Sequence, residues 1–145
     1  MTIREELHID CPPELAFDLM ADVRHLKAWN EGASRADLIT GEPIERGSRF
    51  TTVNRGQELE STITVFDRPG RIDFDVTSKR LDVDSTFTFT ERDGGTALSI
   101  MFEPRPKGVL SVLFPLLKPL IRRDLIKQHL KFKDFCEARA KSQTT

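Results

Sequence analysis

Residues 107–140 read KGVLSVLFPLLKPLIRRDLIKQHLKFKDFCEARA, and this stretch decides how the rest of the chain is organised. Its apolar residues recur every three or four positions, which is the repeat of an α-helix with one buried face. Pro115 and Pro119 fall in its first part, where we expect them to kink the helix or to divide a short first helix from the main one. A helix this long needs a broad apolar surface to pack on. The stripe expected to face that surface consists of Leu110, Leu113, Leu117, Ile121, Leu125, Gln128, Phe132 and Phe135.

The chain before this helix is predicted to build that surface from β-strands. Apolar and polar residues alternate in successive short runs, and turn signals such as Asp93-Gly94-Gly95 separate the runs. Short connections between successive strands imply antiparallel pairing, because parallel pairing would need long crossovers. The predicted strands cover residues 3–10, 36–40, 48–54, 58–66, 71–78, 82–91 and 96–103.

Two short helices are expected between the first strand and the second. Pro12 and Pro13 stop the first strand, because proline cannot donate to the strand ladder and it favours the first turn of a helix. The first short helix is predicted over residues 14–20. Asp22 is placed to cap a second short helix that reaches Trp29.

Some polar residues occupy positions that should point toward the apolar side of this arrangement. A buried polar group costs about 1–3 kcal/mol unless it is paired, so such a cluster would suit the carbonyl or hydroxyl group of a ligand. The plainer alternative is that each residue sits near water or pairs with a neighbour. The residues concerned are Glu5, Thr52, Asn54, Ser61, Ser85 and Gln128.

Composition restricts the classes of function. The 145 residues carry a formal net charge of −1, so no global field points to a nucleic-acid partner. Residues 105–145 carry about 10 Lys/Arg against about 3 Asp/Glu, so the helical end is basic and the strand end is acidic. No run approaches the roughly 20 apolar residues that span a bilayer.

The two cysteines, Cys11 and Cys136, form no C-x-x-C motif. We expect two reduced thiols in the cytoplasm, with a disulfide bridge between them as the alternative.

Catalytic and metal-binding motifs are missing from the sequence. The three histidines, His8, His25 and His129, have no metal-ligand spacing, and no cysteine lies near a histidine in sequence. Neither a nucleophile elbow nor a phosphate loop is present. We therefore expect no metal and no cofactor. The chain has ten phenylalanines and no tyrosine, which favours a hydrophobic ligand over a reaction that needs proton transfer.

The order of elements and several local motifs resemble the START and birch-pollen-allergen superfamily, also called SRPBCC. The resemblance rests on residues 9–22, IDCPPELAFDLMAD, on residues 26–30, LKAWN, and on the Gly47-x-x-Phe50 motif. The chain looks most like the bacterial polyketide cyclase/dehydrase and lipid-transport members. The resemblance implies one α+β domain over residues 1–141 with the helix-grip fold, followed by a loose tail at residues 142–145. In that fold a curved antiparallel sheet of about seven strands wraps around a long C-terminal helix and encloses an apolar cavity.

The family hosts several functions on one fold, so three hypotheses stay open. The leading one is binding, transport or sequestration of a small hydrophobic ligand such as a lipid, a polyketide-like or an isoprenoid compound. The second is a metal-free polyketide cyclase or dehydratase that shapes its substrate, with Glu5 as the candidate acid. The third is a regulatory or chaperone-like protein-interaction module. The expected cavity lining consists of Trp29, Phe50, Ser61, Ile63, Phe74, Val76, Ser85, Phe87, Phe89, Ile100, Phe102, Leu117, Ile121, Leu125, Gln128 and Phe132.

The long helix also carries a second apolar strip on its opposite side. A contiguous exposed strip of this kind usually has a partner. The alternatives are a homodimer contact, a transient contact with an anionic membrane, and partial cover by the loop before the helix. The strip contains Val112, Leu116, Pro119, Ile126 and Leu130, with Arg123, Lys127 and Lys131 beside it.

Overall fold

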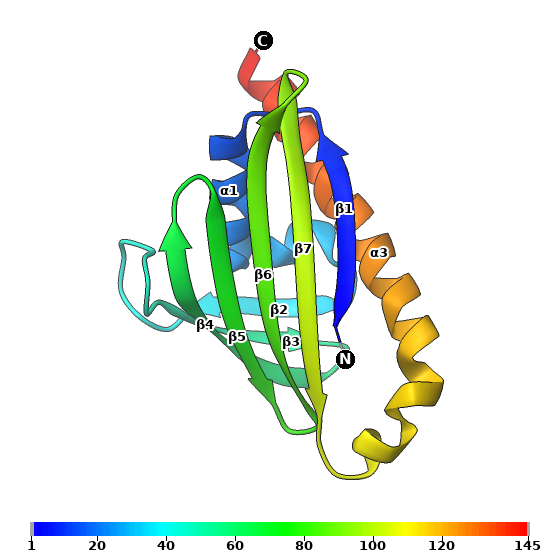
Figure 1. Ribbon diagram of the computed structural model, residues 1–145. Coiled ribbons are helices and arrows are strands. Elements are labelled where there is room, and N and C mark those ends of the chain that lie inside the picture. Colours follow the sequence, from blue (N-terminus) through cyan, green and yellow to red (C-terminus); the bar gives the residue numbers. More distant parts are fainter. Residues whose placement is uncertain (1, 145) are drawn as a thin grey trace.

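The computed structural model describes residues 2–144 and contains a seven-stranded antiparallel sheet, two α-helices after its first strand and a long C-terminal helix (Figure 1). The predicted α+β helix-grip fold is therefore confirmed. The strands are β1 (Ile3–Ile9), β2 (Ala33–Leu38), β3 (Arg49–Asn54), β4 (Gln57–Asp67), β5 (Arg71–Ser78), β6 (Leu81–Arg92) and β7 (Gly95–Pro106). The helices are α1 (Pro13–Ala21), the 3₁₀ turn η1 (Val23–His25), α2 (Leu26–Trp29) and α3 (Val109–Thr144).

Strands β2 to β7 form an antiparallel meander, and β1 pairs with β7, so β1 and β2 are the two edge strands. The strand order of the sheet is β1-β7-β6-β5-β4-β3-β2, with β1 antiparallel to β7. The sheet curves strongly, so that β2 and β3 run across the picture while β6 and β7 stand upright (Figure 1). The turns follow the sequence: Asp93 and Gly94 both have positive φ, at 51° and 78°, as a tight hairpin turn requires.

One strand departs from simple alternation. A bulge between Ile63 and Val65 shifts the register of β4 against β5. One extra residue turns every following side chain to the other face of the sheet. Strict alternation from Ile63 would turn Val65 inward, but after the bulge Phe66 packs inward instead, and its ring lies 5.2 Å from the ring of Phe17 in α1.

The core is solid at one end of the sheet. There α1 and the C-terminal half of α3 pack on the strands, and Phe17 also contacts Phe89 edge to face at 5.6 Å. The residues that fill this region include Ile9, Phe50, Ile63, Ile72, Leu98, Ile100 and Phe132, all nearly inaccessible to solvent.

The long helix differs in two respects from what the sequence pattern predicts, and it decides between two alternatives. Pro115 and Pro119 lie inside one helix, so they do not divide it, and the kink is the alternative that remains. Leu113, expected to face the sheet, is 43% exposed, whereas its neighbour Phe114 is buried. Residues 142–144, expected as a loose tail, continue α3, and Thr145 lies outside the described residues. No helix within residues 2–144 combines the length and the apolar character needed to cross a bilayer.

Candidate functional site

A cavity of about 530 Å³ lies between the concave face of the sheet and the middle of α3. It begins where the solid core ends, and α1, η1 and α2 close one of its sides. Its walls are mainly apolar. Residues from β3 to β7 form the sheet wall, and Ile121, Leu125 and Gln128 form much of the helix wall.

Most of the residues expected to line a cavity do border this one. They come from α2, from the inward faces of the strands and from α3. They are Trp29, Ser61, Phe74, Val76, Ser85, Phe87, Phe102, Ile121, Leu125 and Gln128. That these side chains contact a ligand stays a prediction.

Six other expected lining residues do not border the cavity, for two physical reasons. Phe50, Ile63, Phe89, Ile100 and Phe132 are buried in the filled core, together with residues of α1 and of the C-terminal half of α3. Leu117 lies toward the start of α3, before the helix residues that border the cavity, and is only half-buried. Alternation identified the inward face correctly, but it could not show where along that face the packing ends.

Trp29 both borders the cavity and packs on the core. Its side chain borders the cavity, and its ring also packs edge to face against Phe132 at 5.2 Å. It therefore separates the solid core from the hollow part.

Gln128 is a buried polar residue of the cavity whose side-chain amide is unpaired in the described part of the chain. It borders the cavity and is 4% exposed, yet neither Nε2 nor Oε1 of its amide has a hydrogen-bond partner among the described residues. A buried amide without a partner costs about 1–3 kcal/mol. The group can both donate and accept a hydrogen bond, so it suits an uncharged carbonyl or hydroxyl group.

Glu5 and His129 form a buried pair beside Gln128. Nδ1 of His129 lies 2.5 Å from Oε1 of Glu5, and their side chains are 5% and 12% exposed. The His129 ring meets the rings of Phe87 and Phe102 edge to face and borders the cavity, whereas Glu5 does not. The sequence placed Glu5 on the inward face of its strand, but it gave no signal for its partner 124 residues away.

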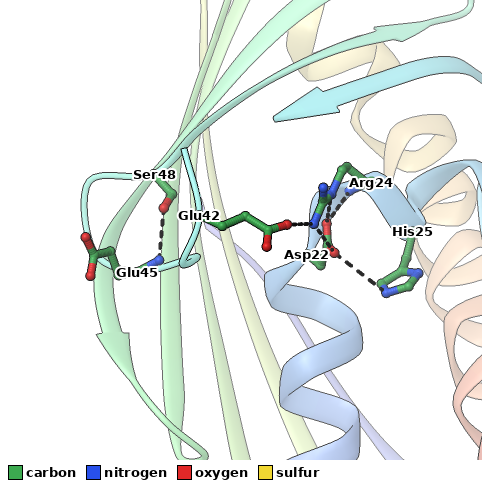
Figure 2. A network of polar contacts seen from close by, with 6 residues as sticks. All are labelled: Asp22, Arg24, His25, Glu42, Glu45 and Ser48. Atoms are coloured by element: carbon green, nitrogen blue, oxygen red, sulfur yellow. Dashed lines mark hydrogen bonds and ion pairs between the residues drawn. The ribbon is translucent and has the colours of Figure 1, made fainter. Parts of the chain in front are cut away.

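Asp22 is a cavity residue that the sequence identified only as a helix cap. Its Oδ1 accepts hydrogen bonds from the backbone N–H and from Nε of Arg24, and Arg24 also donates to Glu42 (Figure 2). Burial acts to raise the pKa of the Asp22 carboxyl, but the hydrogen bonds from Arg24 outweigh it and the pKa lies below its ordinary value. Asp22 is therefore a fully paired carboxylate.

Figure 2 shows how this network holds the connection between β2 and β3. Glu42 reaches from that connection to Arg24 on η1, while Ser48 Oγ accepts a hydrogen bond from the backbone N–H of Glu45. The connection is therefore fixed to the helical side that borders the cavity.

An ion pair bridges the sheet and the helix at one end of the cavity. Nη2 of Arg55, in the β3–β4 turn, donates to Oδ1 of Asp124 in α3 at 2.8 Å. Both residues border the cavity, and their side chains are 61% and 40% exposed, so this end meets solvent.

The two cysteines lie side by side, which the sequence could not show. Both are free and buried, Cys11 at the end of β1 and Cys136 in α3. They belong to the solid core and do not border the cavity. Within residues 2–144 no group of three or more His, Cys, Asp or Glu side chains is placed to hold a metal ion.

One comparison with known proteins gives the family of this chain, and another gives its fold. Residues 1–134 match the family model described as polyketide cyclase/dehydrase and lipid transport. No curated protein matches the sequence.

Among solved structures, the chain is similar to TTHA0849 from Thermus thermophilus, with 17% identity, 97% of this chain and 99% of that one covered, and a TM-score of 0.78. It is similar to the Zhui aromatase/cyclase from Streptomyces sp. R1128, with 12% identity, 96% and 94% covered, and a TM-score of 0.77. It also resembles a START superfamily protein from Mycobacterium smegmatis, with 12% identity, 99% and 99% covered, and a TM-score of 0.73. At these identities the structural matches establish the fold alone, whereas the family model covers most of the sequence. The chain therefore belongs to the polyketide cyclase/dehydrase and lipid-transport family.

Proposed function

We propose that this protein binds a small, mainly apolar molecule in the cavity between the sheet and α3, and that it carries or sequesters that molecule. The observation that supports this function is the apolar cavity of about 530 Å³ beside an otherwise filled core. Small-molecule sites are commonly concave, apolar and about 300–1,000 Å³ in volume, with few polar groups.

The polar residues of the cavity narrow the chemistry of the ligand. Gln128 offers one unpaired amide deep in the cavity, whereas the charged groups Asp22, Arg55 and Asp124 are already paired. A long apolar body with one uncharged oxygen group satisfies this lining. Isoprenoid alcohols and neutral lipids have this character.

A cavity-filling substitution tests the binding proposal. Val83 on β6 borders the cavity, so Val83→Phe places an aromatic ring in the ligand's space. We expect Val83→Phe to weaken binding of the neutral fluorophore N-phenyl-1-naphthylamine about tenfold or more. Val53 is the matched control, because its neighbours Thr52 and Asn54 border the cavity and Val53 itself faces away.

The result that contradicts the proposal is equally specific. If Val83→Phe and Val53→Phe bind the fluorophore as the unsubstituted protein does, the probe does not occupy this cavity.

Native mass spectrometry of protein from its own host provides a second measurement. The absence of both a co-purified small molecule and fluorophore binding would overturn the carrier function.

The Glu5–His129 pair favours one second candidate, a cyclase or dehydratase. A histidine that donates Nδ1–H to a carboxylate keeps Nε2 as a proton acceptor. His129 would take a proton from the carbon beside a ligand carbonyl. The resulting enolate carbon would form a bond to a second carbonyl carbon, and the new alkoxide would receive the proton back from Nε2. Glu5 then acts as a positioning residue and His129 as the catalytic base.

This second function is tested by substitution of either member of the pair. Glu5→Gln and His129→Asn should lower turnover of a poly-β-ketone thioester and alter its pH profile, while fluorophore binding persists. Unchanged turnover in both variants would remove the pair from any mechanism.

A further inference from the structure

The first three turns of α3 present an unpartnered apolar face. In Figure 1 this part of the helix stands away from the sheet, beyond the last strand. Val112 is 77% exposed and Leu116 is 78% exposed, and the other members of the face lie three or four residues from them. We name this face the apolar stripe; it consists of Val109, Val112, Leu113, Leu116 and Leu120.

Unpaired cationic side chains lie in the same segment of the chain as the stripe. No Asp or Glu occurs between Glu103 and Asp124. Within that segment, Lys118, Arg122 and Arg123 make no side-chain hydrogen bond or ion pair with any residue in the described part of the chain.

Two more cations lie close to the start of the helix. The backbone N–H of Lys107 donates to the carbonyl of Arg80 at 2.9 Å, which places the β5–β6 turn beside the beginning of α3. The side chains of Lys79 and Arg80 are exposed and, among residues 2–144, have no ion-pair partner. At 100° per residue, Arg123 lies on the same side of α3 as the stripe, whereas Lys118 and Arg122 lie on the opposite side. We name Lys79, Arg80 and Arg123 the basic cluster.

Acidic side chains at the neighbouring strand ends do not neutralise the basic cluster. Asp82 is paired with Lys107 at 2.8 Å, and Asp84 is paired with Arg105. The surface therefore combines exposed valines and leucines with an excess of free positive charge.

We propose that the apolar stripe and the basic cluster dock on the surface of an anionic lipid bilayer. A helix binds in the plane of such a surface when its apolar residues enter the boundary between head groups and acyl chains and nearby cations meet the phosphates. A second copy of this chain fits less well. A two-fold contact through the stripe would bring each basic cluster against its own copy, and like charges repel.

Vesicle sedimentation tests this docking without any added ligand, so a failure of the proposed ligand binding does not affect the result. The protein should sediment with vesicles of phosphatidylcholine and phosphatidylglycerol, and much less with phosphatidylcholine alone. Leu116→Ser combined with Leu120→Ser should lower the partition coefficient about tenfold or more, because two buried leucines are lost. Lys79→Gln combined with Arg123→Gln should lower it about tenfold, with a weaker dependence on salt.

The control uses an exposed apolar residue elsewhere on the molecule. Ile39 is 48% exposed and lies outside the stripe, so Ile39→Ser should leave vesicle binding unchanged. All variants change exposed residues, and circular dichroism verifies that they fold. Equal binding by the stripe variant and the unsubstituted protein would overturn the proposal, as would failure to bind anionic vesicles. Sedimentation of the unsubstituted protein as a dimer that the stripe variant dissociates would assign the stripe to a second copy.

Discussion

Nδ1 of His129 lies 2.5 Å from Oε1 of Glu5, so the middle of α3 is joined to the first strand by a buried polar contact. Two apolar residues at these positions would fill the same space without a polar group to satisfy. Burying this pair therefore costs the protein stability relative to an apolar pair. The pair lies beside a cavity that also contains the unpaired amide of Gln128.

The first prediction concerns the energetics of this pair. Glu5→Leu leaves the His129 ring buried without its Nδ1 partner, and we expect the free energy of unfolding to fall by about 2–3 kcal/mol. His129→Leu should cost a similar amount for the reciprocal reason. The double substitution should cost clearly less than the sum of the two, because neither polar group remains. Urea unfolding of the four proteins measures this, and strictly additive losses would contradict a direct interaction.

The second prediction concerns the unpaired amide of Gln128. Gln128→Leu removes a buried polar group that has no partner, so the free energy of unfolding should rise by about 1–2 kcal/mol. Gln57 also borders the cavity but is only half-buried, and Gln57→Leu should give no comparable gain. Thermal unfolding measures both variants. Destabilisation by Gln128→Leu would mean that the amide has a partner in solution.

The third prediction concerns acid stability. The pKa of Asp22 is lower in the folded protein than its ordinary value of about 3.9. Its contribution to stability is therefore fully present above that ordinary value and is lost as the pH falls through the lower folded value. Asp22→Ala also removes the cap on the Arg24 N–H, so the variant should lose about 1–2 kcal/mol near neutral pH.

Urea unfolding at several pH values tests this prediction. The difference between Asp22→Ala and the unsubstituted protein should shrink as the pH is lowered below about 4. Asp37→Ala is the control, since Asp37 is exposed and its pair with Arg35 lies at the surface. That variant should change stability by less than about 1 kcal/mol. A difference for Asp22→Ala that grows toward acid would contradict the sign of the shift.

The fourth prediction concerns the two thiols. The neighbouring Cys136 thiol lowers the pKa of the Cys11 thiol, and the neighbouring Cys11 thiol together with burial raises the pKa of the Cys136 thiol. A lower pKa favours the reactive thiolate, but Cys11 is 3% exposed and Cys136 is 0% exposed, so a reagent cannot reach either. We expect Ellman's reagent to label both only as fast as the protein unfolds.

A surface cysteine provides the comparison for this measurement. Ser34 lies on β2 at the edge of the sheet, and the cysteine in Ser34→Cys should react at once. Rapid labelling of Cys11 in the native protein would show that the end of β1 opens without global unfolding.

Much of this architecture could be predicted from the sequence because it depends on local chemistry. Pro12 and Pro13 end a strand and start a helix, and Asp93-Gly94 builds a hairpin turn, whatever packs on them. Strict alternation fixes the inward face of β5 and β6 for the same reason. The exception is β4, where a bulge near Thr64 has no local signature and reverses the faces of Val65 and Phe66.

The position of the cavity could not be predicted, because it depends on side chains that meet only in the folded protein. Phe50 and Phe87 both point inward, yet Phe50 is fully buried in the core, while Phe87 borders the cavity. His129 was unassigned for a related reason. Its position on the helix is at the edge of the buried stripe. Glu5 lowers the energetic cost of burying the ring, because it provides a hydrogen-bond partner for Nδ1.

The two prolines of α3 have a consequence for motion. Pro115 and Pro119 have no backbone N–H, so the helix around them lacks two of its internal hydrogen bonds. The same segment carries the exposed stripe, whereas the second half of α3 is anchored by Phe132 and Cys136 in the core. We expect amide hydrogen exchange to be fast up to residue 120 and slow from residue 128 onward. The first part of α3 would then open more easily than the second part. The α3 residues that border the cavity begin at Ile121, at the boundary between these two parts.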